Sequence, residues 1–301
     1  MHSLHWSKSS PAIGPDVQLS YPDNLSHPDN DRRRVDFAAL GSIIQVPGRH
    51  VRVLVLSDIH GNLEALEACL VAAPAHDATV NLGDIVGYGA SPNEVVDLSR
   101  RSGTFFVRGN HDRASVGLIG LEEFNPLAAL AALWTQSQLT PENQEWLKSL
   151  PHGPLEIDGL PGVQFVHGSP LDEDEYLVTP QDAVEPLLTA AVPLTFYGHT
   201  HQQGYFSSDG VNCEAFRPAY TTVGQPETAA VPLQKEMRYL INPGSVGQPR
   251  DGDWRAAFAV LDAQAGIVTF YRVPYNLKDA QDRIMAANLP ERLATRLAAG
   301  R

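Results

Sequence analysis

Short apolar runs alternate with helical patterns through the first half of the chain. Residues 51–56 are rich in β-branched side chains and predict a buried strand, and residues 63–73 follow with apolar positions at helical spacing. Residues 79–82 and 104–107 predict two more strands, separated by a helix over residues 92–99. Because strands that alternate with helices form parallel sheets, this order predicts strands that end along one common edge.

The second half continues with helices and then with short strands. The helices are predicted at residues 122–139, 141–150, 277–287 and 290–299, and the strands at residues 162–166, 195–197, 238–242, 257–262 and 266–273. The last three strands are separated by turns and look antiparallel. Residues 203–235 contain several Pro and Gly, so we predict an insertion or an edge hairpin there.

Residues 1–48 show little periodicity and are rich in Pro, Ser, Asn and Asp, which predicts a flexible N-terminal extension. They include the basic run Arg32, Arg33 and Arg34. This run could contact a nucleic acid or a partner, but a solvated charge run is the interpretation that we favour. Residues 49–301 are then predicted to form the folded domain.

The composition limits the classes of partner. The chain has 301 residues, 43% of them hydrophobic, and a formal net charge of −13, which is typical of a globular protein and disfavours binding to nucleic acid or anionic membranes. The apolar runs are shorter than a membrane span, and residues 1–14 lack the apolar core of a signal peptide. Cys69 and Cys213 form no CxxC pair, so we expect two thiols in a reducing compartment and predict a cytoplasmic protein.

Residue types that bind metals follow five of the predicted strands. These segments are Asp58-x-His60, Gly83-Asp84, Gly109-Asn110-His111-Asp112, His167-Gly168 and Gly198-His199-x-His201. Strand ends along one edge of a sheet converge, so residues far apart in the sequence can share a site. Carboxylate and amide oxygens mixed with imidazoles suit Mn²⁺, Fe or Zn²⁺ better than Ca²⁺ or an all-thiolate site.

Each segment also has an ordinary structural interpretation. An Asp at a strand end is often a cap or a turn residue, and Gly83-Asp84 alone carries almost no information. The GHTH segment is more specific, because it forces two imidazoles together without an apolar use for them. The order and spacing of all five segments carry the metal-site hypothesis. Phosphate loops of the GxxxxGK[ST] type, GxGxxG turns and GxSxG elbows are absent from the sequence.

The set DxH, GD, GNH[DE], a strand-end His and GHxH resembles the calcineurin-like metallophosphoesterase superfamily, from about Val51 to the C-terminal strands. The resemblance implies an α/β fold, a four-layer αββα sandwich of two mixed β-sheets flanked by helices. It also implies two divalent metal ions. Asp58, His60 and His201 would bind one ion, Asn110, His167 and His199 would bind the other, and Asp84 would bridge the two. Mn²⁺ is the expected metal, with Fe, Zn²⁺, Ni²⁺ and Mg²⁺ as alternatives.

The implied reaction is phosphoester hydrolysis by in-line attack of a metal-bridging hydroxide. His111 is the candidate general acid for the leaving oxygen, and its alternative role is a supporting hydrogen bond. Arg108 is either a fork for phosphate oxygens or a plain surface residue. Asn62 either orients substrate or caps the helix that follows, which is the role that we favour. Arg250 is a third candidate substrate contact, but the Pro243-Gly244 turn explains its segment equally well.

Departures from the pattern narrow the substrate class. Gly87 and Tyr88 stand where protein serine/threonine phosphatases of this superfamily carry an Asp that orients the catalytic His and an Arg that binds phosphate, which disfavours a protein phosphatase. The stretch from Gly83 to Val95 and the NPGS segment are similar to small bacterial phosphoesterases, the YfcE-like phosphodiesterases and diadenosine-polyphosphate hydrolases. Residues 113–150 and 203–235 are predicted to wall the substrate pocket, because they join strand ends that carry ligands.

We therefore expect hydrolysis of small phosphodiesters or nucleotides. The alternatives are a diadenosine-polyphosphate or nucleotide pyrophosphohydrolase, a protein phosphatase, a catalytically silent scaffold and a DNA nuclease. The complete ligand set disfavours the scaffold, and the acidic charge disfavours the nuclease. Two divalent ions would outweigh the two ligand carboxylates, so the net charge of −13 does not exclude a small phosphorylated substrate. No membrane partner is expected, and the sequence leaves the oligomeric state open.

Overall fold

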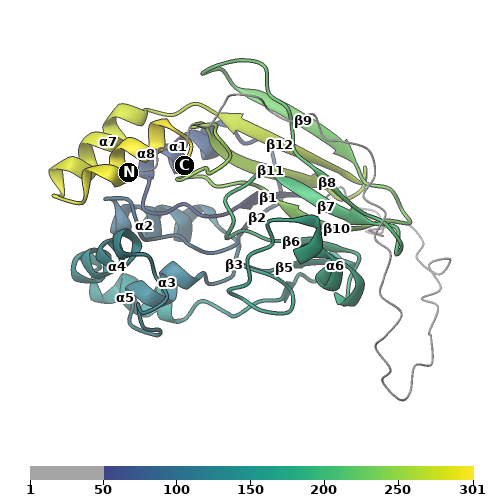
Figure 1. Cartoon of the computed structure of the whole chain (residues 1–301), viewed down its shortest axis with the longest axis horizontal. Coiled ribbons are helices and arrows are strands. Elements are labelled where there is room, and N and C mark those ends of the chain that lie inside the picture. The colour runs from purple at the N-terminus through teal and green to yellow at the C-terminus, as the bar shows by residue number, and fades with distance from the viewer. Residues whose placement is uncertain (1–50) are drawn as a thin grey trace, which may run out of the picture.

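The computed structural model of the chain describes residues 51–301, so the predicted extension over residues 1–48 lies outside the described residues. Two six-stranded sheets face each other (Figure 1). The first sheet has the order β3 (Phe105–Phe106), β2 (Ala78–Asn81), β1 (Arg52–Leu56), β11 (Ala256–Asp262), β12 (Ile267–Val273) and β9 (Glu227–Pro232). The second has the order β4 (Leu155–Glu156), β5 (Val163–Phe165), β6 (Leu194–Phe196), β10 (Arg238–Asn242), β7 (Gly204–Ser208) and β8 (Cys213–Phe216).

Both sheets are mixed. In the first, β1 pairs parallel with β2 and antiparallel with β11, and in the second, β10 pairs parallel with β6 and antiparallel with β7. The helices are α1 (Leu63–Ala72), α2 (Pro92–Ser102), α3 (Asn110–Ser115), α4 (Pro126–Gln138), α5 (Pro141–Lys148), α6 (Pro180–Thr189), α7 (Leu277–Ala286) and α8 (Glu291–Ala298). None of the helices in residues 51–301 is long and apolar enough to cross a membrane.

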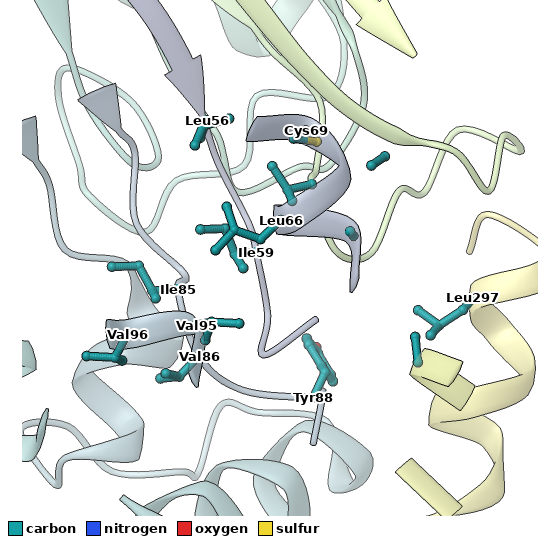
Figure 2. Close-up of a cluster of buried hydrophobic side chains, with 14 of the residues drawn as sticks. Leu56, Ile59, Leu66, Cys69, Ile85, Val86, Tyr88, Val95, Val96 and Leu297 are labelled. Atoms are coloured by element: carbon teal, nitrogen blue, oxygen red, sulfur yellow. The ribbon is translucent and has the colours of Figure 1, made fainter. Parts of the chain in front are cut away.

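Successive side chains of β1 point into two different apolar cores, and the described chain has three such cores. Leu54 points to the core under the helices, whereas Val53 and Val55 point to the core between the sheets, because successive side chains of a strand face opposite ways. Figure 2 shows the first of these cores, where Ile59 lies beside Leu66 of α1. A third core packs α6 on the outer face of the second sheet. The structure therefore has the predicted order of helix, sheet, sheet and helix, and the predicted fold class is confirmed.

Residues 203–235 contribute strands to both sheets. The edge-hairpin alternative is confirmed, because β7 and β8 pair antiparallel and β8 forms the edge of the second sheet. The sequence did not predict that β9 joins the other sheet, where it pairs with β12. The prediction for the strand at residues 238–242 needs a similar correction. That strand, β10, lies in a different sheet from β11 and β12 and has one parallel neighbour.

Capping groups explain where several helices begin. The helix predicted from residue 122 begins at Pro126, because the Asn125 side chain accepts a hydrogen bond from the Ala128 amide. Helix α6 was not predicted, although the sequence carries its start signal. Thr179 and Asp182 form a capping box around Pro180.

Candidate metal centre

Loops at the ends of strands from both sheets bring the seven candidate ligands together. Asp58 and His60 follow β1, Asp84 follows β2, Asn110 begins α3, His167 follows β5, and His199 and His201 follow β6. Six of these side chains form two buried groups whose ligand atoms lie within 4.8 Å of one another, with Asp84 a member of both. The seventh, Asn110, places its Oδ1 atom 3.3 Å from Nε2 of His167. The structure therefore assembles the complete predicted set.

The two oxygens of Asp84 face different halves of the cluster. Its Oδ2 lies 3.5 Å from Nε2 of His60, and its Oδ1 lies 3.6 Å from Nε2 of His167. On the first side, Oδ1 of Asp58 lies 3.3 Å from Nε2 of His201. On the second side, Nδ1 of His199 lies 3.1 Å from Nε2 of His167. A carboxylate split in this way can serve two cations at once.

Backbone carbonyls determine which imidazole nitrogens are available. Nδ1 of His60 donates to the Val86 carbonyl at 3.1 Å, and Nδ1 of His201 donates to the Gln248 carbonyl at 2.6 Å. A carbonyl can only accept, so each Nδ1 carries the proton and each Nε2 presents a lone pair. The two Nε2 atoms face each other at 3.1 Å, and burial lowers the pKa of both imidazoles well below the usual value.

Two neutral nitrogen lone pairs at that distance repel unless a cation shares them. His167 has the same arrangement, with Nδ1 donating to the Leu82 carbonyl at 2.8 Å and Nε2 turned towards Asp84. A carbonyl that orients a ligating imidazole is the usual support of a protein metal site. The donor set of carboxylates, one amide and imidazoles therefore fits divalent metal ions of the Mn²⁺, Fe or Zn²⁺ type.

The backbone at these ligands is unusual. Seven residues other than glycine have a positive φ within residues 51–301, and five of them are candidate ligands. The five are Asp58, His60, Asp84, His199 and His201, with φ between 49° and 64°. Left-handed backbone costs about 1–2 kcal/mol for such residues, and this kind of strain clusters at functional sites. The surrounding hydrogen bonds therefore hold the ligand loops in strained conformations.

Electrostatics within the cluster favour a bound cation. Burial raises the pKa of the Asp58 carboxyl to about 7, and burial together with the nearby Asp112 raises that of Asp84. Two carboxylates enclosed in one dry site are costly as anions, and a divalent cation offsets that cost directly.

His111 lies at the edge of this cluster, on α3, and is 5% exposed. Its ring centroid is 4.5 Å from that of Tyr88, 4.8 Å from that of His60 and 5.0 Å from that of Phe124. Its Nδ1 atom is buried without a hydrogen-bond partner among the described residues, and a Cβ at Gly87 would lie 2.6 Å from it. Packing therefore positions the imidazole, and Gly87 leaves the room that it needs.

Asp112 is an important residue that the sequence analysis did not single out. Its carboxylate, fully buried, accepts hydrogen bonds from the amides of Asp84, Ile85, Val86 and Gly109 at 2.9–3.2 Å. Four amide donors occupy both oxygens and leave no acceptor for a carboxyl proton, so the ionised form fits this position. Asp112 thereby ties the loop of Asp84 to the loop that carries His111. Its place in the GNHD segment was the only sequence signal.

The three predicted substrate contacts have different surroundings. Asn62 caps α1, since its Oδ1 accepts from the Ala65 amide and its Nδ2 donates to the Gly247 carbonyl, which confirms the capping alternative. Arg108 makes two hydrogen bonds to Glu173, at 2.9 and 3.0 Å, so its fork is already engaged. Arg250 donates to Gln248 Oε1 at 3.0 Å and lies near the Tyr88 hydroxyl, at 3.4 Å.

A cavity of about 380 Å³ opens directly in front of the cluster. Asn110, His111 and His199 line it, together with Ile119, Gly120 and residues 122–125. Tyr176 also lines it and packs on His199 with ring centroids 3.8 Å apart, although half of its surface stays exposed. No sequence pattern pointed to Tyr176. A cavity lined by polar and aromatic side chains can hold a small ester beside the ligand cluster.

Both the fold and the ligand cluster define a metallophosphoesterase. Residues 51–266 match the family model of the calcineurin-like phosphoesterase superfamily domain, so the chain belongs to this superfamily of phosphoester hydrolases. The predicted superfamily and enzyme class are therefore confirmed.

Three known proteins resemble most of this chain. The protein MJ0912 of Methanocaldococcus jannaschii is 38% identical over 255 residues, which cover 83% of this chain and 98% of the relative. The crystal structure of a metallophosphoesterase from Sphaerobacter thermophilus is 42% identical with a TM-score of 0.71 and covers 84% of this chain and 100% of that one. The hypothetical protein PH1004 of Pyrococcus horikoshii, at 21% identity and a TM-score of 0.66 over 83% of this chain and 99% of that one, shares the fold.

Proposed function

We propose that this protein hydrolyses small phosphodiesters or nucleotide phosphoesters at a centre of two divalent metal ions, with Mn²⁺ as the preferred metal. The observation that carries the proposal is the pair of facing Nε2 lone pairs on His60 and His201, together with the divided carboxylate of Asp84. When bound, the ions supply Lewis-acid activation of water and neutralise charge on the phosphoryl group.

The roles of the ligands follow from their places in the cluster. Asp58, His60 and His201 surround one position, and Asn110, His167 and His199 surround the other, with Asp84 between them. Each group combines oxygen and imidazole donors, which suits Mn²⁺ and also Fe, Zn²⁺, Ni²⁺ or Mg²⁺. The carbonyls that fix the imidazole tautomers keep the lone pairs aimed inward before any cation arrives.

His111 is the general acid in this proposal. It lines the cavity in front of the ligands, where the leaving oxygen of a bound ester would lie. Burial, followed by the charge of Arg250, lowers the pKa of the free imidazole well below its usual value. A bound anionic ester favours the protonated ring, so the substrate itself raises the pKa that proton donation needs.

Helix α4 and the loop before it support the predicted pocket wall in part. Ile119, Gly120, residues 122–125 and Ala128 line the cavity beside His111, so the segment 113–150 would contact the leaving group. Residues of the segment 203–235 line a separate cavity on the His201 side. We therefore propose that the two segments contact different parts of one substrate.

The experiment compares Asp84→Asn with His111→Ala, using bis(p-nitrophenyl) phosphate as substrate and elemental analysis for bound metal. Asp84→Asn should lose both activity and metal, because it removes a charge that faces both halves of the cluster. His111→Ala should lose activity, by ~10²–10⁴-fold, and keep its metal. Wild-type turnover in both variants would show that the site is wrongly assigned.

Metal stoichiometry tests the dinuclear centre separately. The wild type should bind two Mn²⁺ per chain by equilibrium dialysis, and its activity should disappear with a chelator and return with Mn²⁺. His167→Ala should bind one, because His167 faces only the second half of the cluster. His76→Ala is the matched control, since His76 is exposed and contacts only its own loop and Thr79. A single Mn²⁺ in the wild type would contradict the dinuclear centre.

A further inference from the structure

A second cavity, of about 720 Å³, is lined by Gln202 and Gln203, which directly follow the candidate ligand His201. Four arginines of residues 51–301 line it, which is unusual in a chain of net charge −13. Two of the four are neutralised: Arg255 pairs with Asp253 and Glu227, and Arg272 pairs with Asp251.

The other two arginines, Arg217 and Arg250, have no carboxylate partner among residues 51–301. Arg217 donates to the carbonyls of Gln202 and Gln203 and to Oε1 of Gln202, at 2.9–3.4 Å. Arg250 donates to Oε1 of Gln248, and its Nε atom is buried with no hydrogen-bond partner in the described chain. No carboxylate of residues 51–301 therefore neutralises either guanidinium, and both lie in a partly enclosed space, where an anion is stabilised more than in water.

Short contacts join this cavity to the metal centre. Gln202, which holds Arg217, directly follows the candidate ligand His201. The Arg250 amide donates to the His201 carbonyl at 3.2 Å. The Arg250 guanidinium also lies over the Tyr88 ring, 5.7 Å from its centroid, and that ring is 4.8 Å from His60. Arg250 lines this cavity and contacts Tyr88, which lines the cavity in front of the candidate ligands, so the two cavities are neighbours at this pair of side chains.

The opposite cavity differs in charge. The lining beside His111 carries Glu122, Glu123 and the aromatic rings of Phe124 and Tyr176, and it includes no arginine of residues 51–301. An anionic group would be repelled there and attracted on the His201 side. The charge difference between the two cavities gives a bound substrate one orientation.

We propose that the arginine cavity binds a second anionic group of the substrate, with Arg217 and Arg250 as its cationic contacts. The preferred substrate is then a phosphoester with another phosphate or a carboxylate a few bonds from the ester that is cleaved. This inference rests on the proposed function, since it assigns the second end of the same substrate. The leaving group of this substrate is uncharged and occupies the cavity of His111.

Two thymidine compounds that differ by one phosphate test the cavity. Thymidine 3′,5′-bisphosphate and thymidine 5′-phosphate are titrated into the Mn²⁺-loaded protein by calorimetry. The 5′-p-nitrophenyl esters of the same two nucleotides give kcat/KM values. The wild type should prefer the compound with the second phosphate by about tenfold or more in both measurements, as expected for a charge-assisted contact with arginine.

Arg217→Gln removes the charge and should bring both ratios close to one, whereas Arg217→Lys should retain most of the preference. Comparing ratios cancels any loss that the substitution causes at the metal centre itself. Arg101→Gln, at an exposed arginine on α2, is the matched control and should leave both ratios as in the wild type.

Equal affinity of the wild type for the two nucleotides, or a preference that survives in Arg217→Gln, would overturn the anion site. Failure of the proposed function gives a different result. The ratio of binding affinities would still depend on Arg217, but neither the p-nitrophenyl esters nor bis(p-nitrophenyl) phosphate would be hydrolysed. The cavity would then bind an anion, and its assignment to a substrate would be overturned.

Discussion

Replacing Asp112 with Asn should weaken both the fold and metal binding, although the two side chains have nearly the same shape. Oδ1 of Asp112 accepts from the amides of Ile85 and Val86, and Oδ2 accepts from those of Asp84 and Gly109. In Asn, one of these oxygens becomes an NH₂ group that cannot accept. Two buried amides then lose their partner and face a donor instead.

The magnitude follows from these four contacts. A hydrogen bond to a charged group contributes about 1.5–3 kcal/mol, so losing two costs roughly 3–6 kcal/mol, less the relief of no longer burying a charge. We expect a net loss of about 3 kcal/mol, which lowers Tm by roughly 6–12 °C in a chain of this size. The amide of Asp84 is one of the four, so affinity for Mn²⁺ should also fall, by ~10–100-fold.

The assays are calorimetric unfolding of the metal-free protein and titration with Mn²⁺. Asp97→Asn, at a half-exposed carboxylate on α2, is the control and should change neither value. If Asp112→Asn unfolds within about 2 °C of the wild type and binds Mn²⁺ equally well, the carboxylate does not hold the ligand loops as described.

Three further predictions concern separate parts of the chain. Gly87 has a φ of +91°, and Gly87→Ala places a methyl group 2.6 Å from Nδ1 of His111. The variant should keep its metal content, but its kcat should fall by at least about tenfold. Full activity would show that His111 has room to move. Burial raises the pKa of Cys213 to about 11 and shields Cys69 completely, so iodoacetamide at pH 8 should label Cys213 slowly and Cys69 only after unfolding, as mass spectrometry can check. Hydrogen bonds from residues 221–222 and from an arginine lower the pKa of Glu227 from 4.5 to about 2. Glu227→Gln should therefore have a lower Tm than the wild type above pH 4.5, and this difference should vanish as the pH falls towards 2. A difference in Tm that does not depend on pH would contradict this ionic role.

Most of the ligand set could be predicted from the sequence because it rests on local signals. A run of β-branched residues followed by a polar turn, as at β1 and Asp58, indicates where a strand ends and what it delivers. Parallel strands end at a shared edge, so five such turns imply one site. The cap at Asn62 was equally readable, since it depends on residues within three positions.

Predictions failed where contacts are distant in the sequence. The strand at residues 238–242 was placed beside the later antiparallel strands, because nothing local indicates that it pairs with β6 and β7 in the other sheet. For Arg108 the sequence left a phosphate fork and a plain surface residue open, and it could not indicate the contact with Glu173, which lies 65 positions away. The alternation in β9 is compatible with a strand in either sheet, and only its pairing with β12 decides which.

The sequence by itself therefore determined the superfamily, the fold class and the residues that can bind metals, because these depend on local patterns and on the general geometry of parallel strands. Only the tertiary structure decided how those residues are charged and oriented. The carbonyls of Val86 and Gln248 aim the imidazole lone pairs, and Asp112 holds the ligand loops. Arg217 has no carboxylate partner within residues 51–301 for the same reason: pairing depends on distances between segments, which no local pattern encodes.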